Sequence, residues 1–393
     1  MRLPQIHFEQ HTATTALSRF VAAHSSIFAR NKIILVVTDS RLSGIFQPVI
    51  ESIELQNNIQ CLTAFVDYEP DASLISTVIN LIDDNAIPLV IGIGGGSVLD
   101  TTKIATSLSS SRQSLETFLQ HPRQIVKRNI PMALVPTLIG TGAELSCGIS
   151  LRFPSGKKGA LGNPSFLADL VIYDASICST APQSIAFACA SDAFSHALES
   201  LVSRNATTWS RRTAKGALEG IIESTELISS NSNSYEGWED LIISTIEASV
   251  SLSIAGGGIG HALAYEISDC TNLSHSNILA RLLPNLIRFY LESELIEDRL
   301  AQILTNETTL LSFCKNLEPF PLNSEKIDMV CVNALDNTRL ITNHPSIVSF
   351  QQLRNIVLQD NTLEKYLKKG ESHVCKENWK TTIIGNDASI DYN

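Results

Sequence analysis

The stretch PLVIGIGGGSVLDTTK, residues 88–103, runs from an apolar segment through three consecutive glycines into residues that favour a helix. A continuous apolar segment is typical of a strand that is buried on both faces of a parallel sheet. Glycines let an anion approach backbone N–H groups, and the positive end of the following helix attracts negative charge. We therefore expect Gly94, Gly95, Gly96 and Ser97 to bind a diphosphate. An ordinary tight turn would also explain these glycines, because their spacing is not GxGxxG.

Further apolar segments on both sides of this stretch are separated by helical patterns. The expected strands cover residues 32–39, 61–66, 88–93, 132–136 and 170–174, and the expected helices cover residues 12–30, 45–57 and 71–84. Asp71 is a suitable N-cap for the last of these helices. Strands that alternate with helices predict an α/β domain with right-handed crossovers.

The pattern changes after Pro182. Residues 183–360 contain long helical patterns and no convincing strand, and the residues from 361 onward are polar. A chain of 393 residues is also too long for one ordinary core. We therefore predict an α/β dinucleotide-binding domain over residues 1–182, an all-α domain over residues 183–360 and a loosely packed polar tail over residues 361–393.

Composition and charge exclude several classes of protein. The net charge is −11 and no long basic run is present, so we do not expect nucleic acid as a partner. No apolar run reaches the length of a membrane span, and the first residues do not resemble a signal peptide. The eight cysteines are scattered without a CxxC pair, which favours free thiols in a reducing cytoplasm over a disulfide framework.

A second informative stretch, SDAFSHALE at residues 191–199, lies in the helical half. Asp192 and His196 are four residues apart, so a helix would place them on one face. With His261 and His275 they would form a set of one oxygen and three nitrogen ligands, which suits Zn²⁺ or Fe²⁺ and leaves room for a substrate oxygen. A single histidine is more often an ordinary core or surface residue than a ligand. The set of four therefore predicts a metal site more strongly than any one member does.

A second loop of small residues, VPTLIGTGAE at residues 135–144, also follows an expected strand. Ligands of α/β sheets bind at the carboxyl ends of strands, so we expect both loops to line one cleft, with Thr137, Leu138 and Thr141 near the cofactor. Asp39 ends another expected strand. Its carboxylate could accept hydrogen bonds from a ribose 2′-OH and would repel a 2′-phosphate, which favours NAD over NADP. A capping role at the end of the strand is equally compatible with the sequence.

Together, these motifs resemble the iron-containing alcohol dehydrogenase family of the dehydroquinate synthase-like superfamily. The resemblance covers roughly residues 30–355. The matching residues are Gly94, Gly95, Gly96, Ser97, Asp100 and Lys103 in the first loop, Pro136, Thr137, Gly140, Thr141, Gly142 and Glu144 in the second, then Lys157, Lys158 and Asp169 to Asp174, the metal positions Asp192, His196, His261 and His275, and finally Asp336, Asn343, His344 and Pro345.

This resemblance implies a dinucleotide-binding α/β domain followed by a helical domain, with the metal and the nicotinamide in the cleft between them. It implies reversible, NAD(P)-dependent oxidation of a small alcohol to an aldehyde or ketone by hydride transfer. The four metal positions would hold a divalent ion that acts as a Lewis acid toward the substrate oxygen. Asp100 and Lys158 are expected to contact the cofactor, and the protein is expected to be a homodimer.

Tyr265 is the main departure from this family. The family often has a histidine four residues after its third metal ligand, and Tyr265 stands at that distance from His261. We expect both residues to be catalytic, His261 as a ligand and Tyr265 as a substrate contact or proton relay, because a phenol with a pKa near 10 is a weak base at neutral pH. Two alternatives stay open. One is an enzyme like the dehydroquinate synthases or glycerol dehydrogenases, and the other is a metal- and nucleotide-binding protein with weakened catalysis. The substrate and the choice between iron and zinc are also open.

Overall fold

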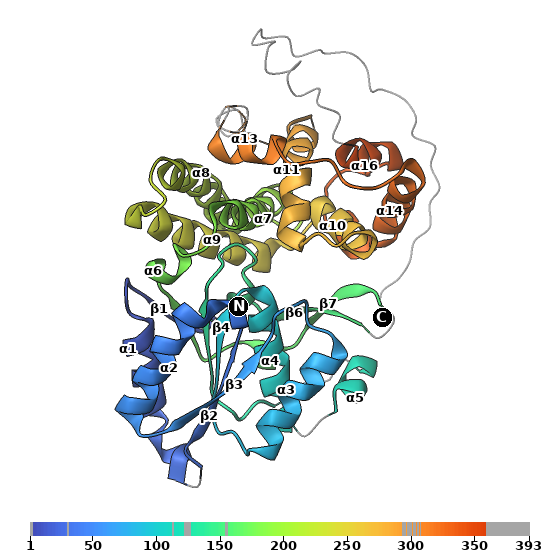
Figure 1. Cartoon of the computed structure of the whole chain (residues 1–393). Coiled ribbons are helices and arrows are strands. Elements are labelled where there is room, and N and C mark those ends of the chain that lie inside the picture. The colour runs from blue at the N-terminus through green and yellow to red at the C-terminus, as the bar shows by residue number, and fades with distance from the viewer. Residues whose placement is uncertain are drawn as a thin grey trace, which may run out of the picture. The chain divides into compact units, whose positions relative to one another are not determined.

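The structure is a computed structural model that describes residues 3–358, with the exception of residues 30, 112–113, 122–126, 154–155, 293–295, 297–300, 302–303, 305 and 307. The described residues belong to one compact unit, in which an α/β part precedes a helical part (Figure 1). The polar tail predicted over residues 361–393 lies outside the described residues.

A six-stranded parallel sheet forms the centre of the α/β part (Figure 1). Its strands are β1 (Gln5–Phe8), β2 (Ile33–Thr38), β3 (Gln60–Phe65), β4 (Val90–Gly94), β5 (Met132–Pro136) and β8 (Leu170–Tyr173). Their order across the sheet is β1-β8-β5-β4-β2-β3, and every pair is parallel. The five predicted strands are therefore confirmed, and the parallel sheet agrees with the predicted α/β class.

Helices cover both faces of this sheet. They are α1 (Ala13–Ala23) and α2 (Ser43–Asn57) on one face, and α3 (Ala72–Asp84) and α4 (Gly96–Ser111) on the other. Ile34 and Val36 of β2 pack with α1 and α2, whereas Leu35 and Val37 pack with α3 and α4. Successive residues of a strand point to opposite faces, so a strand covered on both sides needs apolar residues at every position. This explains the continuous apolar run in the sequence.

The beginnings and ends of the helices follow local chemistry. Asp71 caps α3, because its carboxylate accepts a hydrogen bond from the N–H of Leu74 at 2.8 Å, as predicted. The helix predicted over residues 12–30 is shorter than expected, since α1 ends at Ala23 and a 3₁₀ turn follows at Ser25–Ala29. Two consecutive serines at the start of that turn are poor helix formers, and they explain the early end.

Three strands were not predicted from the sequence. One is β1, at the edge of the sheet, where Gln5 and Ile6 are exposed. The others are β6 (Gly148–Arg152) and β7 (Lys158–Gly162), which form a separate antiparallel hairpin. Glycine or polar residues interrupt the apolar residues in all three. None of them has the continuous apolar run that marks a strand buried on both faces.

The rest of the described chain is helical, and it contains no strand after Tyr173. Its helices are α6 (Ala175–Cys178), α7 (Gln183–Val202), α8 (Thr208–Ser230), α9 (Tyr235–Ala255), α10 (Ile259–Cys270), α11 (His275–Glu292), α13 (Thr309–Lys315), α14 (Ser324–Asp336), α15 (Thr338–Ile341) and α16 (Phe350–Val357), and the short α5 (Leu115–Gln120) lies in the α/β part. Helix α7 packs against α8, α9 and α11, so its residues 186–202 are all buried. The position of a domain boundary near residue 182 stays a prediction.

No single helix of the described residues is both long enough and apolar enough to cross a membrane. Helices α9 and α10 meet that criterion of length and composition only as a pair, and the pair is bent by 99°.

Candidate metal and cofactor site

Helix α7 carries on one face three side chains that can bind a metal ion or exchange a proton. Asp192, His196 and Glu199 are separated by four and then three residues, which is the spacing of neighbours on a helix surface. All three are buried, because other helices surround α7. The interior of the helical part therefore contains two carboxylates and an imidazole side by side.

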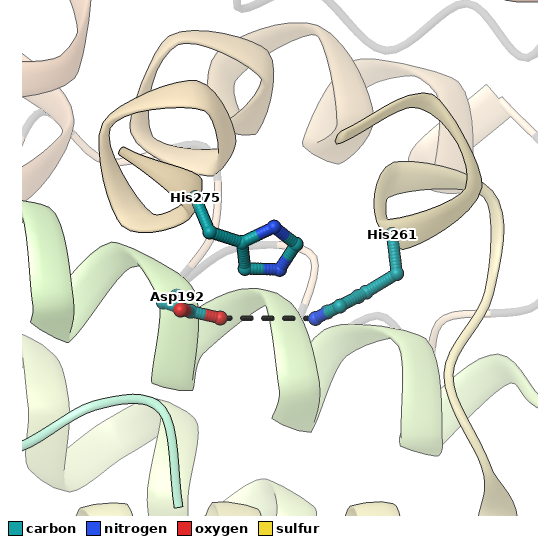
Figure 2. Close-up of side chains that lie close together, drawn as sticks. All are labelled: Asp192, His261 and His275. Carbon is teal, nitrogen blue, oxygen red and sulfur yellow. Dashed lines mark ion pairs between the residues drawn. The ribbon is translucent and has the colours of Figure 1, made fainter. Parts of the chain in front are cut away.

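Two further helices bring histidines to Asp192. His261 lies in the first turn of α10, and His275 is the first residue of α11. One donor atom from each of Asp192, His261 and His275 lies within 4.8 Å of the other two. Figure 2 shows the three side chains turned toward one another, with Nε2 of His261 at 3.7 Å from Oδ1 of Asp192. Three of the four predicted metal positions therefore converge.

His196 lies beside this group of three. Its Nε2 is 3.3 Å from Oδ1 of Asp192, and its ring stacks on that of His261 with centroids 4.7 Å apart. The donor atoms that converge are those of Asp192, His261 and His275. The role of His196 as a fourth ligand stays a prediction.

Several donor atoms at this site have no protein partner. Among the described residues, Oδ1 of Asp192, Nδ1 of His196, Nε2 of His261 and Nδ1 of His275 are buried and make no hydrogen bond. A buried polar atom without a partner is rare and costs roughly 1–3 kcal/mol, so the three in the converging group of Asp192, His261 and His275 indicate a bound group. Carboxylate and imidazole donors suit a divalent ion such as Zn²⁺ or Fe²⁺. The side chains present therefore fit a divalent metal ion.

Burial and neighbouring charges set the protonation of the site. Burial lowers the pKa of His196 to about 4 and that of His275 to about 3, so both rings are neutral at pH 7 and keep a lone pair for a ligand. Burial also acts to lower the pKa of His261, but the Glu199 and Asp192 carboxylates outweigh it and raise this pKa to about 10. A metal ion would displace the proton of His261 on binding.

Glu199 is a residue that the sequence patterns did not reveal. Its Oε2 lies 2.7 Å from Nδ1 of His261, the ring nitrogen that is not the one close to Asp192. Histidines that bind a metal commonly bond a carboxylate through their second nitrogen. The signal in the sequence is the position of Glu199 three residues after His196, on the same helical face as both metal positions of α7.

Tyr265 lies one turn after His261 on α10. Its ring centroid is 5.5 Å from that of His275, so the structure places it next to the metal group. Burial raises the pKa of Tyr265 to about 12. A phenol with that pKa stays protonated at neutral pH and suits a hydrogen-bond donor better than a base. The predicted catalytic role of Tyr265 remains a prediction, and this environment favours a substrate contact.

The two loops predicted to bind the cofactor lie together at the ends of neighbouring strands. The N–H of Thr137 donates to the carbonyl of Gly94 at 3.0 Å, and β4 pairs with β5. A Cβ atom at Gly95 would lie 3.1 Å from the side chain of Leu138. Gly95, Gly96 and Ser97 are partly exposed where α4 begins. The predicted common edge of the two loops is therefore present.

The second loop also contacts the helix that bears the metal positions. A Cβ atom at Gly140 would lie 2.1 Å from the carbonyl oxygen of Cys189, so only glycine allows this loop to pass so close to α7. The other side of the loop contacts the glycine loop, because a Cβ atom at Gly96 would lie 3.5 Å from the hydroxyl of Thr141. The loop thus links the glycine loop to the helix of Asp192.

Asp39 and Asp100 both have partners within the protein. The carboxylate of Asp39 accepts hydrogen bonds from the backbone N–H of Arg41 at 2.9 Å and from its Nε at 2.8 Å. The carboxylate of Asp100 accepts from the N–H of Ser150 at 2.8 Å and from the ammonium of Lys103 at 3.2 Å. The bond from the N–H of Arg41 is the capping contact, which is one of the two roles that the sequence allows for Asp39. The expected cofactor contacts of both residues stay predictions.

Lys158 lies at the start of β7 with its side chain largely buried. Its ammonium pairs with Glu69, which also pairs with Arg152 of the neighbouring strand at 2.9 Å. Its backbone N–H donates to Asp269 of α10 at 2.9 Å, and its charge lowers the pKa of His275. The hairpin thus ties Lys158 to α10, the helix of His261, while its predicted contact with the cofactor stays a prediction.

Comparison with known protein families finds two matches that lie in succession along the chain. Residues 8–175 match the model described as iron-containing alcohol dehydrogenase. Residues 187–319 match the model of the C-terminal part of the Fe-containing alcohol dehydrogenase family. The chain belongs to the iron-containing alcohol dehydrogenase family. It is therefore an oxidoreductase that acts on CH–OH groups, and the resemblance found in its motifs is confirmed.

Individual relatives agree with this place in the iron-containing alcohol dehydrogenase family. The chain is 27% identical over 281 residues to the probable alcohol dehydrogenase EutG of Salmonella typhimurium, a match that covers 70% of each chain. It is 29% identical over 287 residues to long-chain-alcohol dehydrogenase 1 of Geobacillus thermodenitrificans, a match that covers 72% of each. The crystal structure of sulfoacetaldehyde reductase from Bifidobacterium kashiwanohense in complex with NAD⁺ is similar in fold, with a TM-score of 0.76 at 18% identity over 94% of this chain and 98% of that one.

Proposed function

We propose that the protein interconverts a small alcohol and its aldehyde or ketone by NAD(P)-dependent hydride transfer at a divalent metal site. The observation that carries this proposal is the convergence of Asp192, His261 and His275, each of which has a buried donor atom without a protein partner. His196, which lies against Asp192, is the proposed fourth ligand. Membership of the family supports the class of reaction.

The bound ion would supply Lewis acidity, which lowers the pKa of an alcohol and polarises a carbonyl. The side chains of this protein orient the participants. The hydroxyl of Ser276 donates to Oδ2 of Asp192 at 3.1 Å, which fixes the carboxylate and leaves its Oδ1 free for the site. Tyr265 lies beside His275 and keeps its proton at neutral pH, which supports the proposal that it donates a hydrogen bond to a substrate oxygen.

The glycine loop would bind the diphosphate of the cofactor. Gly95, Gly96 and Ser97 are partly exposed at the N-terminus of α4, where free N–H groups and the helix dipole favour an anion. The other residues proposed to line the cofactor are Asp39, Gly94, Asp100, Thr137, Leu138, Thr141 and Lys158. NAD is the proposed cofactor, because sulfoacetaldehyde reductase, which is similar in fold, binds NAD⁺ and because Asp39 disfavours a 2′-phosphate. NADP is the alternative, since Arg41 neutralises that carboxylate.

A metal-loaded screen tests the proposal. Purified protein is stripped of metal, reloaded with Fe²⁺ or Zn²⁺, and mixed with NAD or NADP and a panel of short-chain alcohols, polyols and aldehydes. We expect a metal-dependent change in NADH or NADPH absorbance with at least one substrate. Product without a net change in the reduced cofactor would favour an enzyme of the dehydroquinate synthase kind. Absence of any reaction would favour a metal- and nucleotide-binding protein with weakened catalysis.

We also propose that the protein is a homodimer in the cytoplasm. Among the described residues, β1 pairs only with β8, and the apolar side chains of Leu3, just before it, and Ile6, within it, are 41% and 36% exposed. An exposed edge strand with apolar side chains is suited to pairing with a second chain. The seven described cysteines are free, which supports a reducing compartment. Light scattering of the purified protein measures the oligomeric state, and a monomeric mass would contradict the dimer.

A further inference from the structure

The bend between α9 and α10 wraps around the carboxylate of Glu199. This side chain comes from α7 and is buried inside the bend, where the two helices meet at 99°. Its Oε2 accepts a hydrogen bond from the N–H of Gly258 at 2.5 Å. Its Oε1 accepts from the N–H of Gly260 at 2.6 Å and from that of His261 at 3.3 Å. A side chain of another helix therefore satisfies the first N–H groups of α10, which have no partner within the helix.

The glycines of this bend make room for the carboxylate. A Cβ atom at Gly258 would lie 3.2 Å from Cδ of Glu199, and one at Gly260 would lie 2.8 Å from its Oε1. On the other side of the bend, the side-chain amide of Asn343 donates to the carbonyl of Gly257 at 2.7 Å. The N–H groups of the bend are thus held by Glu199 and a carbonyl group by Asn343, so the backbone before His261 has little freedom to move.

His261 takes up the last acceptor position of Glu199. Nδ1 of His261 lies 2.7 Å from Oε2, so four N–H groups share the two oxygens of the carboxylate. A carboxylate offers about four acceptor positions, and none is left for a proton. Nδ1 of His261 must therefore carry the hydrogen of this bond. Its Nε2 is buried, has no protein partner and lies beside Asp192, so this is the nitrogen that would bind the metal ion once the ion has displaced its proton.

We propose that Glu199 is a positioning residue that fixes the tautomer and the orientation of His261 and thereby sets the affinity of the site for its metal ion. The proposal rests on the metal site proposed above and adds to it a residue outside the set of ligands. Glu199 does not reach the ion or the substrate in this arrangement; it acts through His261 and through the backbone of the bend. Partners of this kind typically contribute 10- to 100-fold to metal affinity.

The test is the affinity of the full chain for Zn²⁺, measured by competition with a chromogenic chelator after the native metal has been removed. Glu199→Gln keeps the shape of the side chain but replaces one acceptor oxygen with a donor that faces N–H groups. We expect it to weaken Zn²⁺ binding about 10- to 100-fold. Glu144→Gln is the matched control. Glu144 is another buried carboxyl group, but its partner is the hydroxyl of Tyr173 at 2.7 Å, so this exchange should leave Zn²⁺ affinity unchanged.

A double-mutant cycle distinguishes positioning from a general structural role. If Glu199 acts through His261, then Glu199→Gln added to His261→Ala should change Zn²⁺ affinity by less than roughly threefold. If Glu199→Gln weakens Zn²⁺ binding as much in the His261→Ala protein as it does in the wild-type chain, Glu199 acts independently of His261 and the proposal is overturned. Wild-type affinity in Glu199→Gln would overturn it as well, while the proposed function would stand. If the wild-type chain itself binds no Zn²⁺ or Fe²⁺, the proposed function fails first.

Gly260→Ala provides a second variant, which decides the matter alone if Glu199→Gln does not fold. It keeps the carboxylate but places a methyl group 2.8 Å from Oε1 of Glu199 and 2.6 Å from Cδ1 of Leu286, the flexible end of a side chain, at a helical position where alanine is otherwise favoured. We expect weaker Zn²⁺ binding in this variant. Gly44→Ala in α2 is its control, because a Cβ atom there meets nothing within 4 Å. Equal affinity in Gly260→Ala and Gly44→Ala would contradict the proposal.

Discussion

Tyr265 is the residue at which this chain departs from the family pattern within the site itself. The ordinary pKa of histidine is about 6.5, whereas burial raises the pKa of Tyr265 to about 12. The residue keeps its proton through the range in which a dehydrogenase works. A donor of one hydrogen bond can still orient a substrate oxygen beside His275, but it cannot serve as a neutral-pH base.

Tyr265→Phe tests this role. We expect kcat/KM to fall about five- to tenfold, because one hydrogen bond is worth about 1 kcal/mol, while the shape of the pH profile between about pH 6 and pH 9 stays the same. The measurement is steady-state kinetics over that range with the best substrate of the screen. Loss of one ionisation from the profile would show that Tyr265 relays protons instead.

Asp39 and Arg41 form a pair in which two opposite charges act on the same part of the proposed cofactor site. Asp39→Gly should shift the kcat/KM ratio toward NADP about tenfold, because it removes a charge that repels a 2′-phosphate. Arg41→Ala should shift the ratio toward NAD by about threefold, because it restores the full charge of Asp39. Kinetics with both cofactors measure the ratios. Unchanged ratios in both variants would remove this pair from the ribose site.

Secondary-structure elements were predictable where burial on both faces requires a continuous run of apolar residues. The strands β2, β4, β5 and β8 are covered on both faces, and their apolar runs identify them. The strands of the hairpin β6–β7 lack such a run, and Lys158 and Arg152 in it are held by Glu69, a residue that lies far away in the sequence. No local pattern carries that information, so these elements depend on tertiary contacts.

The same distinction between local patterns and tertiary contacts applies to the metal site. The spacing of Asp192 and His196 on one helix is local, so the sequence shows it, and the resemblance to a family added His261 and His275. Glu199 bonds the backbone at Gly258 and Gly260, and this contact exists only after α10 has folded back against α7. Its role could not be inferred until the bend was known.

Asp174 joins three elements and makes acid stability testable. Its carboxylate accepts hydrogen bonds from the N–H groups of Thr12 and Ala13 at the start of α1, and from that of Ser176 at the start of α6. Burial acts to raise the pKa of Asp174, but hydrogen bonds from the Ser176 hydroxyl and from the N–H groups of Ala13, His11 and Ser176 outweigh it and hold the pKa below its ordinary value. The ionised side chain therefore stabilises the folded state.

Asp174→Asn should lower the free energy of unfolding by about 1–3 kcal/mol at neutral pH. Because the folded pKa lies below the unfolded value near 4, the contribution of Asp174 is complete above about pH 4 and is lost as the pH falls through the folded pKa. Urea unfolding at several pH values measures this. The difference in the free energy of unfolding between the wild-type protein and Asp174→Asn should become smaller only in acid. A difference that becomes smaller as the pH rises would contradict a stabilising role of the ionised Asp174.

At the scale of the whole molecule, the metal group connects helices that are distant in the sequence. Asp192 belongs to α7, His261 to α10 and His275 to α11, and Figure 2 shows them meeting in the helical part. An ion that binds these three side chains binds only the folded chain. It therefore adds to the stability of the helical part as well as to its chemistry.

Removal of the metal should lower the melting temperature by several degrees, since an ion at 100 times its Kd contributes about 2.7 kcal/mol. Calorimetry of the wild-type protein with and without an excess of chelator measures the change. His275→Ala serves as the control, because its melting temperature should not respond to the chelator. Equal melting temperatures of the wild-type protein in both conditions would indicate that no ion is held by the folded state.

The most direct test of the metal site is the metal content of the purified chain and of His275→Ala, each stripped, reloaded with Zn²⁺ or Fe²⁺ and freed of excess ion. We predict about one ion per wild-type chain, as for a single site with one carboxylate and several imidazole ligands, and much less in a folded His275→Ala protein. Full metal content in His275→Ala, or none in the wild-type chain, would contradict the account.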